Sequence, residues 1–367
     1  MAPSQSLQVH LSPAELSYLR STLSQTPPIR LDHSKGPRDF RSMRAEYDVL
    51  PTANGSARIA LEDGLEALVG VKAEVEKSQC HSPLGRRESP PTISPGDVSM
   101  LDGDDEDDAG AGGQNAWVEL SIEVPGFRDD DPLPVFLGSM LHETLVADGQ
   151  LTHSLYINRR FHWKLYIDIL LLSPPLSYPL ALLSMTTHLA LLTTRLPALK
   201  SEKDEDPLFD DDWAAAIPLY PNCKQSGSNV VNKPPVIVVA MAVGENIVFD
   251  PCKEELAVAD TVLALACTAS PSSSTGARIV GMRTIDPPSH LTPPGIPNSM
   301  NSATGGTAPT SSTSALTQRE LLANSGVWIP PRGGMKRTLL AQVSKMVSEK
   351  GGIGEEVINA LEGIEVG

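Results

Sequence analysis

Two adjacent arginines, Arg159 and Arg160, stand just before a run of alternating apolar residues, and His162 follows them. Cationic side chains are the groups that contact nucleic-acid phosphates without reading sequence. We therefore interpret Arg159 and Arg160 as a candidate RNA-binding pair, with a solvated strand end as the plainer alternative. The second adjacent pair, Arg86 and Arg87, falls in a segment whose composition predicts no fixed geometry.

Acidic residues and histidines could carry other chemistry. Asp168 lies opposite the apolar side of its run, and we favour a structural hydrogen-bond acceptor over a catalytic acid. The run 102–108 lacks the central glycine and terminal glutamate of a calcium loop, so we interpret it as a solvated loop. The eight histidines form no HExxH motif, and no Walker or G-x-G-x-x-G motif is present. The sequence therefore predicts no metal and no cofactor.

Charge and composition bound the class of protein. The net charge of −16 argues by itself against nucleic-acid binding, but much of it lies in blocks at 102–108, 129–131 and 204–212. The charge of the whole chain therefore decides little. The sequence has no apolar run of membrane-spanning length and no signal-peptide pattern at its start. Its four cysteines lack metal-type spacing, which favours reduced thiols in an intracellular protein.

Hydrophobic periodicity predicts a mixed α/β protein. A capping box at Ser12 opens a helix, and residues 56–75 form a hairpin that turns at Asp63-Gly64. Alternation predicts strands, and leucine spacing predicts helices. The expected strands are 117–124, 163–171, 236–243, 246–250, 260–269 and 277–283, and the expected helices begin near 135, 176 and 339.

Composition also predicts how the chain is divided. Segments rich in Ser, Pro, Gly and acid cannot bury enough apolar surface to order themselves. We expect an N-terminal helix in 1–28, a first lobe over 29–200 and a second lobe over 234–367, joined by an acidic and polar linker at 201–233. The first lobe would contain a disordered acidic insertion at 77–115, and the second a disordered insertion at 284–314.

Several motifs, in order over about residues 10–350, carry a family likeness. They are 28–32 with 39–41, 54–58 with Asp63-Gly64, 163–170, and 248–251 with Glu254 and Glu255. They resemble the RNase PH family, and within it the ring subunits of the RNA exosome. The resemblance implies an α/β (α+β) RNase PH fold of two ribosomal-protein-S5 domain-2-like lobes, each a mixed sheet with helices packed on one face.

The resemblance also implies partners and a location. Such a chain would join other RNase PH-like subunits in a hetero-hexameric ring, with S1- and KH-type cap subunits above it and RNA in its channel. It would have no membrane partner, and it would be found in the nucleus, nucleolus and cytoplasm.

The residues that would bind phosphate in an active family member are replaced here. The family's Gly-Gly-Thr-Arg loop corresponds to the sequence Ser173, Pro174, Pro175, Leu176 and Ser177. Proline has no N–H to donate, so this degenerate phosphate loop cannot form the same cradle. The family's arginine pair falls on Pro132 and Leu133, and its catalytic aspartate falls on Lys233. We therefore predict no catalytic residue.

Together these features predict a non-catalytic structural subunit of the exosome core ring. It would support 3′-to-5′ RNA processing and degradation, including ribosomal-RNA maturation and mRNA turnover, and would line the RNA channel. Two alternatives stay open. One is an active phosphate-dependent 3′-to-5′ exoribonuclease, and the other is a different silent ring subunit of the same family.

Overall fold

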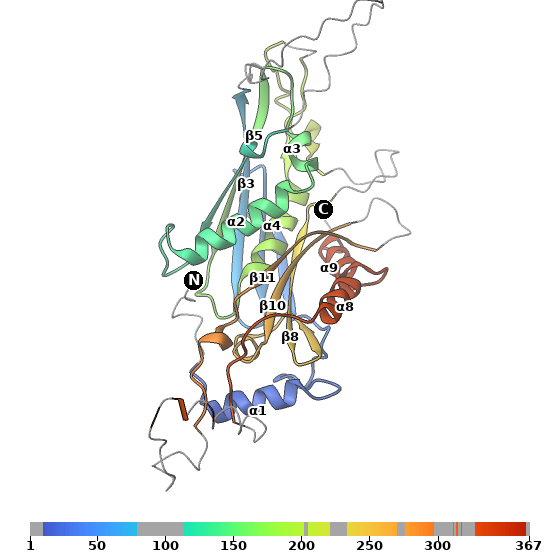
Figure 1. Cartoon of the computed structure of the whole chain (residues 1–367). Coiled ribbons are helices and arrows are strands. Elements are labelled where there is room, and N and C mark those ends of the chain that lie inside the picture. The colour runs from blue at the N-terminus through green and yellow to red at the C-terminus, as the bar shows by residue number, and fades with distance from the viewer. Residues whose placement is uncertain are drawn as a thin grey trace, which may run out of the picture.

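The computed structural model describes residues 10–78, 113–201, 205–220, 233–269, 276–296, 311, 313–314, 317 and 327–364. These residues form two lobes arranged end to end, each built on its own sheet (Figure 1). The predicted α/β architecture of two lobes is therefore confirmed. Most of the acidic insertion predicted at 77–115 lies outside the described residues.

The first lobe is built on a five-stranded mixed sheet with the order β1-β2-β3-β5-β4. Only the pair β4 and β5 is parallel among these strands. Apolar residues alternate along the strands, which gives the sheet one buried face. The strands are β1 Met43–Tyr47, β2 Gly55–Leu61, β3 Glu66–Lys77, β4 Val118–Glu123 and β5 Phe161–Leu171.

The predicted hairpin is the β2–β3 pair. Gly64 has a φ of 84°, which a glycine adopts without steric cost, and the turn lies where Asp63-Gly64 predicted it. Ile59 and Val69 are fully buried on the same face of the sheet, as their alternation predicted.

Three helices belong to the first lobe: α2 Pro132–Val146, α3 Gln150–Ser154 and α4 Leu180–Thr193. Helix α2 packs along the edge strand β4. It begins at Pro132, three residues before the start near Val135 that was expected, because proline fits the first helical position without losing a hydrogen bond.

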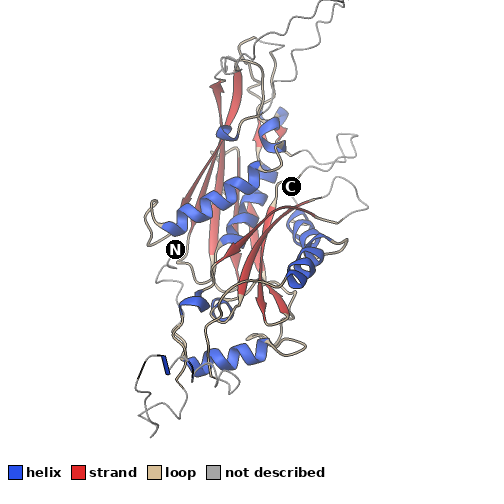
Figure 2. Cartoon of the chain, viewed as in Figure 1, coloured by secondary structure: helices blue, strands red, loops and turns tan. Residues whose placement is uncertain are grey.

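The second lobe is built on a four-stranded antiparallel sheet with the order β11-β10-β8-β9. Helices α8 and α9 pack on it (Figure 2). Strands β8 and β10 are buried along their whole length, as their continuous apolar sequences indicate. The elements are β8 Val236–Val243, β9 Asn246–Phe249, β10 Thr261–Thr268, β11 Arg278–Ile285, α6 Lys253–Leu256, α8 Arg337–Ser348 and α9 Ile353–Glu362.

Helix α4 belongs to the cores of both lobes. It packs on β2 and β3 of the first sheet and on β8 of the second. Every residue of the helix except Leu192 is buried, so the single apolar stripe predicted over 176–196 is wrong in extent. Leu176 lies outside the helix and is exposed, and Leu196 lies in the short strand β6 Arg195–Leu196. Burial on all sides is what a helix between two sheets requires.

The N-terminal helix α1, Pro13–Leu23, lies against the second lobe. The predicted capping box is present, with Glu15 N–H donating to Ser12 Oγ and Ser12 N–H donating to Glu15. Arg20 of α1 forms an ion pair of 2.6 Å with Asp260. The chain therefore begins on the second lobe and crosses to the first between residues 30 and 43.

Three sequence expectations need correction. The insertion expected at 284–314 begins too early, because Ile285 is buried at the end of β11 and Gly295 N–H donates to the Trp328 carbonyl. The expected linker 201–233 contains packed residues, among them Phe209, whose ring contacts Trp163. Helix α9 follows α8, which was expected to be the last helix. Among the described helices, none is long and apolar enough to cross a bilayer.

Candidate functional site

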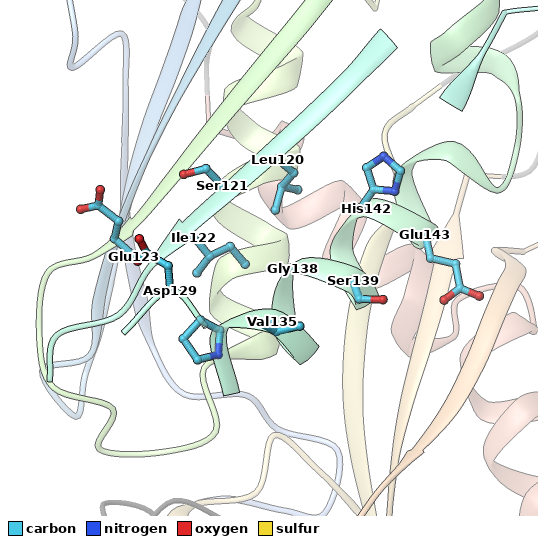
Figure 3. A pocket seen from close by; sticks show the side chains of 11 residues that line it. Leu120, Ser121, Ile122, Glu123, Asp129, Val135, Gly138, Ser139, His142 and Glu143 are labelled. Atoms are coloured by element: carbon cyan, nitrogen blue, oxygen red, sulfur yellow. The ribbon is translucent and has the colours of Figure 1, made fainter. Parts of the chain in front are cut away.

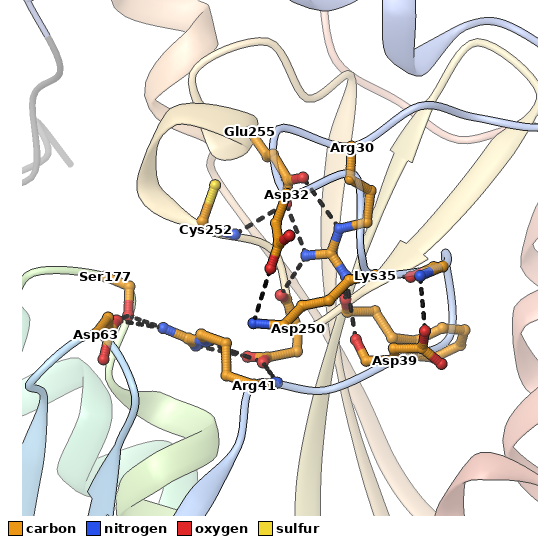
Figure 4. Close-up of polar contacts among 12 residues, drawn as sticks. Arg30, Asp32, Lys35, Asp39, Arg41, Asp63, Ser177, Asp250, Cys252 and Glu255 are labelled. Carbon is orange, nitrogen blue, oxygen red and sulfur yellow. Dashed lines mark hydrogen bonds and ion pairs between the residues drawn. The ribbon is translucent and has the colours of Figure 1, made fainter.

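An ion-pair network joins the two lobes around Arg41 (Figure 4). The Arg41 guanidinium pairs with Asp250 of the second lobe and with Asp63 at the β2–β3 turn, each at 2.5 Å. Arg41 Nε and backbone N–H both donate to Asp250 Oδ2, at 2.9 and 2.8 Å. Burial alone would lower the pKa of Arg41, but the carboxylates of Asp250 and Asp63 raise it above its ordinary value. Arg41 is therefore fixed in its charged form.

Arg30 forms the second half of the network. Its guanidinium makes a two-point contact with Glu255, at 3.0 Å from Nε and 2.9 Å from Nη2. Nη2 also donates to the Asp250 carbonyl at 2.9 Å, and Nη1 donates to the Asp39 carbonyl at 3.1 Å. Both members of the ion pair are buried, at 5% and 1% exposure. Burial opposes the charge of Arg30, and its contact with Glu255 raises the pKa of Arg30 above the usual value.

Local structure places the carboxylates of this network. Asp250 follows β9 with a φ of 46°, a left-handed conformation that aspartate tolerates better than most residues. Helix α6 then begins, and its first turn is closed by Cys252 N–H donating to Glu255 at 3.0 Å. Glu255 therefore caps its own helix and holds Arg30 with the same carboxylate.

The motif residues that carried the family likeness meet in this network. They come from four separate stretches of sequence, and they are Arg30, Arg41, Asp63, Asp250 and Glu255. The three nitrogens of the Arg41 guanidinium all donate to Asp250, Asp63 or Ser177, so most of its donors are occupied. The network is therefore suited to holding the lobes together rather than to catalysis.

The degenerate phosphate loop, Ser173–Ser177, lies at the end of β5 next to the network. Arg41 Nη1 donates to Ser177 Oγ at 2.7 Å, and that hydroxyl donates to Asp63 Oδ2 at 3.2 Å. At the other end of the loop, Ser173 Oγ accepts from the Glu66 N–H at 3.0 Å. The loop's hydroxyls are thus bonded to protein groups, and the cation that contacts the loop is neutralised by two carboxylates.

Two other family positions were assigned from the sequence. Pro132 and Leu133 lie in the first turn of α2 rather than before it. Lys233 forms an ion pair with Glu362 of α9, and its carbonyl accepts from Thr268. Lys233 therefore anchors the start of the second lobe.

The candidate RNA-binding pair lies at the opposite end of β5 from the degenerate loop. Arg159 and Arg160 are exposed in the turn before the strand, and Arg160 pairs with Asp206 at 3.0 Å. Strand β5 has 11 residues, which separates the pair from the loop by about 35 Å at ~3.3 Å per residue. The structure therefore does not bring the two candidate regions together.

His162 and Asp168, also on β5, differ in their surroundings. The His162 ring stacks on Trp117 at 4.4 Å between centroids, and burial lowers its pKa. It is a packed side chain, which does not suit a phosphate contact. Asp168 is exposed on the opposite face, between Gly70 and Ser121, and no described residue donates to its carboxylate. The expected structural acceptor therefore has no donor in the described part of the chain.

Two surface hollows lie outside the network. The first, of about 560 Å³, runs between β4 and α2 and is lined by Glu123, Asp129 and Glu143 but by no lysine or arginine (Figure 3). Such a groove repels phosphate. The second, of about 270 Å³, lies beside the start of α8 and contains three cations, Arg20, Arg332 and Lys336. Within the described residues, no group of three His, Cys, Asp or Glu side chains could hold a metal ion.

The second hollow was missed in the sequence. Its signal is the stretch Arg332-Gly333-Gly334-Met335-Lys336-Arg337, which places two cations and two glycines directly before a helix and a third cation at its first residue. Basic residues around glycines at a helix start are a known arrangement for anion binding.

The fold and the network define a two-lobed α/β chain whose lobes are joined by a buried ion-pair network, and its sequence resembles exosome components. No family model matches the sequence. Exosome complex component RRP42 of Saccharomyces cerevisiae is 28% identical over 254 residues, 69% of this chain and 80% of the relative. Exosome complex component rrp42 of Schizosaccharomyces pombe is 27% identical over 288 residues, 74% and 83% of the two chains. The predicted resemblance to an exosome subunit of the ribosomal-RNA-processing protein 42 type is thereby confirmed.

Among solved structures, the archaeal exosome core is matched over 74% of this chain and 84% of that chain, with 20% identity and a TM-score of 0.46.

Proposed function

We propose that this chain is a non-catalytic structural subunit of an exosome core ring, supporting 3′-to-5′ RNA processing and degradation. The absence of catalysis is supported above all by the partners of Arg41. The arginine that contacts the degenerate loop is already paired with Asp63 and Asp250. A phosphate ligand would have to displace the buried carboxylate of Asp250 or the more exposed one of Asp63, and uncovering the buried charge is costly.

Phosphorolysis needs cations and backbone N–H groups aimed at the attacking phosphate. The loop offers two prolines, Pro174 and Pro175, which have no N–H group. Loss of even one such contact costs ~10²–10³-fold in rate. These absences together support a scaffold rather than an enzyme.

The proposed partners follow from the relatives that the chain resembles. Other RNase PH-like subunits would sit beside it in a hetero-hexameric ring, S1- and KH-type subunits would cap the ring, and RNA would pass through the channel. The chain would support ribosomal-RNA maturation and mRNA turnover in the nucleus, nucleolus and cytoplasm. We further propose the division at 1–28, 29–200, 201–233 and 234–367, with the first lobe's sheet before the linker and the second lobe's sheet after it.

Co-expression tests the structural role. The full chain, expressed with the RNase PH-like, S1- and KH-type subunits of one exosome, should purify in a single complex with one copy of each ring subunit, measured by native mass spectrometry. A chain that folds but stays outside the complex would contradict the proposal. Incorporation at the position of the subunit numbered 43 or 45 would instead identify it as another silent ring subunit.

An activity assay tests the absence of catalysis. The purified chain, incubated with oligo(A), inorganic phosphate and Mg²⁺, should release no nucleoside diphosphate. Release that disappears in Asp168→Asn would instead favour the active phosphate-dependent exoribonuclease.

A further inference from the structure

The cavity beside α8 concentrates positive charge in a chain of net charge −16. Its lining contains three cations, Arg20, Arg332 and Lys336, and one acid, Asp260. Arg337, the next residue along the chain from Lys336 and the first residue of α8, does not line the cavity but is exposed beside it in sequence. A cavity of about 270 Å³ is large enough for a phosphate group.

The cations of this cavity differ in how firmly their carboxylate partners hold them. Arg20 is held by Asp260 at 2.6 Å, and Asp260 also accepts from the Gly244 N–H at 2.7 Å. Lys336 pairs with Glu245 at 3.1 Å, but the two side chains are 67% and 83% exposed. Water and salt screen such a pair, so it holds Lys336 only weakly. Lys336 and Arg337 can therefore exchange a weak partner or water for a phosphate at little cost.

Without a bound anion, the cations at the start of α8 are electrostatically unfavourable. The first turn contains no acid, and Lys336 at the N-cap makes no side-chain capping bond. The N-terminal end of a helix carries partial positive charge, so cations there repel it and an anion stabilises it. Helix α9 has Glu355 and Glu356 in its first turn, and α1 has Glu15. The cations around α8 thus lie where α1 and α9 place acids.

The backbone before the helix leaves the cavity open. Gly333 and Gly334 have φ values of 77° and 89°, which side chains rarely adopt. A Cβ at Gly334 would meet no atom of the described residues within 4 Å, so none of them occupies that space. The Thr261 hydroxyl holds the Gly334 carbonyl at 2.8 Å, which fixes the loop against β10.

We propose that this cavity binds a backbone phosphate of RNA, with Lys336 and Arg337 as its principal contacts and the N-terminus of α8 behind them. The choice of RNA as the source of the phosphate rests on the proposed function. The cations extend along the loop from 332 to 337, which suits neighbouring phosphates of an extended strand better than a single free ion. Binding should therefore be independent of sequence and strongly dependent on salt.

Two matched charge reversals, one at each end of α8, test the site. Lys336→Glu/Arg337→Glu removes the proposed contacts at the start of α8. Lys345→Glu/Lys350→Glu makes the same change in net charge at exposed positions near the end of α8. Acids at the helix start favour the helix dipole, so the first variant should fold as well as the original chain. Lys336→Gln/Arg337→Gln checks the effect without new negative charge.

Fluorescence anisotropy with a labelled 20-nucleotide oligo(U) measures binding by the full chain over a salt series. We expect Lys336→Glu/Arg337→Glu to weaken binding about tenfold and to reduce the slope of log K against log salt by about 1.4, the value for two contacts with a single strand. The Gln variant should weaken binding less, and the control pair should have a smaller effect than either. Equal losses in the two Glu variants, or binding unchanged at 336 and 337, would overturn the site.

A competition experiment distinguishes RNA from other sources of the bound phosphate. Inorganic phosphate or a phosphoserine peptide that displaces oligo(U) at equal phosphate concentration would overturn the assignment to RNA in favour of a free ion or a protein partner. Absence of oligo(U) binding by the unmodified chain at low salt would overturn it as well. These titrations use the isolated chain, so they stay informative even if the chain fails to enter an exosome ring, which would refute only the proposed function.

Discussion

Positive charge is used in two ways in this molecule. Arg30 is buried and is bound by Glu255 and by backbone carbonyls, and the largely buried Arg41 is bound by one carboxylate from each lobe. Lys336 and Arg337 are exposed beside an uncapped helix start. The buried arginines belong to the motifs that indicate the family, whereas the exposed cations belong to no motif quoted for it. In this chain, the arginines of the motifs stabilise the fold, and the proposed phosphate contacts are cations outside the motifs.

Removal of the central arginine should have the largest effect. Arg41→Ala leaves Asp250, which is 5% exposed, without its cation, and breaking a buried pair in this way costs about 3–5 kcal/mol of unfolding free energy. Arg44→Ala is the control, because Arg44 is 82% exposed and pairs only with Glu46. Urea unfolding of both variants measures the difference. Equal stability of the two variants would mean that the network contributes nothing to holding the lobes.

The buried, neutral His188 should give the next largest effect, which is on the pH dependence of stability. Burial lowers the pKa of His188 to about 4, and its Nδ1–H donates to the Pro234 carbonyl at 2.8 Å. Because the folded pKa lies below the unfolded value of about 6.5, the unfolded chain binds a proton first as pH falls. This residue should therefore cost up to about 3 kcal/mol of stability between pH 6.5 and pH 4.

The variant His188→Gln can still donate to Pro234 but does not titrate. Its stability should fall less steeply than that of the original chain over the same pH range, in thermal unfolding at each pH. Parallel curves for the two proteins would show that His188 is not the group responsible.

Keeping the charge while changing its shape should have an intermediate effect. Arg30→Lys retains a cation beside Glu255 but loses the planar two-point contact and the bonds to two carbonyls. We expect a loss of about 1–3 kcal/mol, the scale of a charged hydrogen bond left unmade. Lys35→Arg, at a partly exposed ion pair with Glu62, should change stability little. A loss at Arg30→Lys no larger than at Lys35→Arg would indicate that charge alone matters in the network.

The smallest effect is expected at the arginine pair before β5. Arg159→Glu/Arg160→Glu should lower the RNA affinity of an assembled ring about twofold, because Arg160 already pairs with Asp206. Assembly should be unchanged. A larger loss here than in Lys336→Glu/Arg337→Glu would reverse the order of importance proposed for the two basic regions.

Local sequence patterns predicted the elements that local chemistry determines. The capping box at Ser12 and the turn at Asp63-Gly64 both lie where short-range rules place them. Strand β5 was predicted because its alternation is long. Helix α9 was missed, although it carries buried residues at helical spacing beginning with Ile353.

The candidate site could be predicted only in part. The motifs indicated that Arg30 and Glu255 matter, but they are 225 residues apart, and no periodicity pairs them. Alternation placed the arginine pair and the loop 173–177 at opposite ends of β5, but it could not show that the loop lies beside the network that joins the lobes. The cations at 332–337 were missed because they follow a segment whose composition suggested disorder.

Helix α4 has a consequence for any attempt to divide the molecule. It is contributed by the first lobe, yet Ser184 Oγ accepts from the Ile237 N–H at 2.8 Å and the helix packs on β8. A fragment 234–367 produced alone would expose the apolar surface of β8 to water and should aggregate, whereas its co-production with 1–233 should restore a soluble pair. The polar linker therefore marks a place where the chain can be cut but not where the core can be separated.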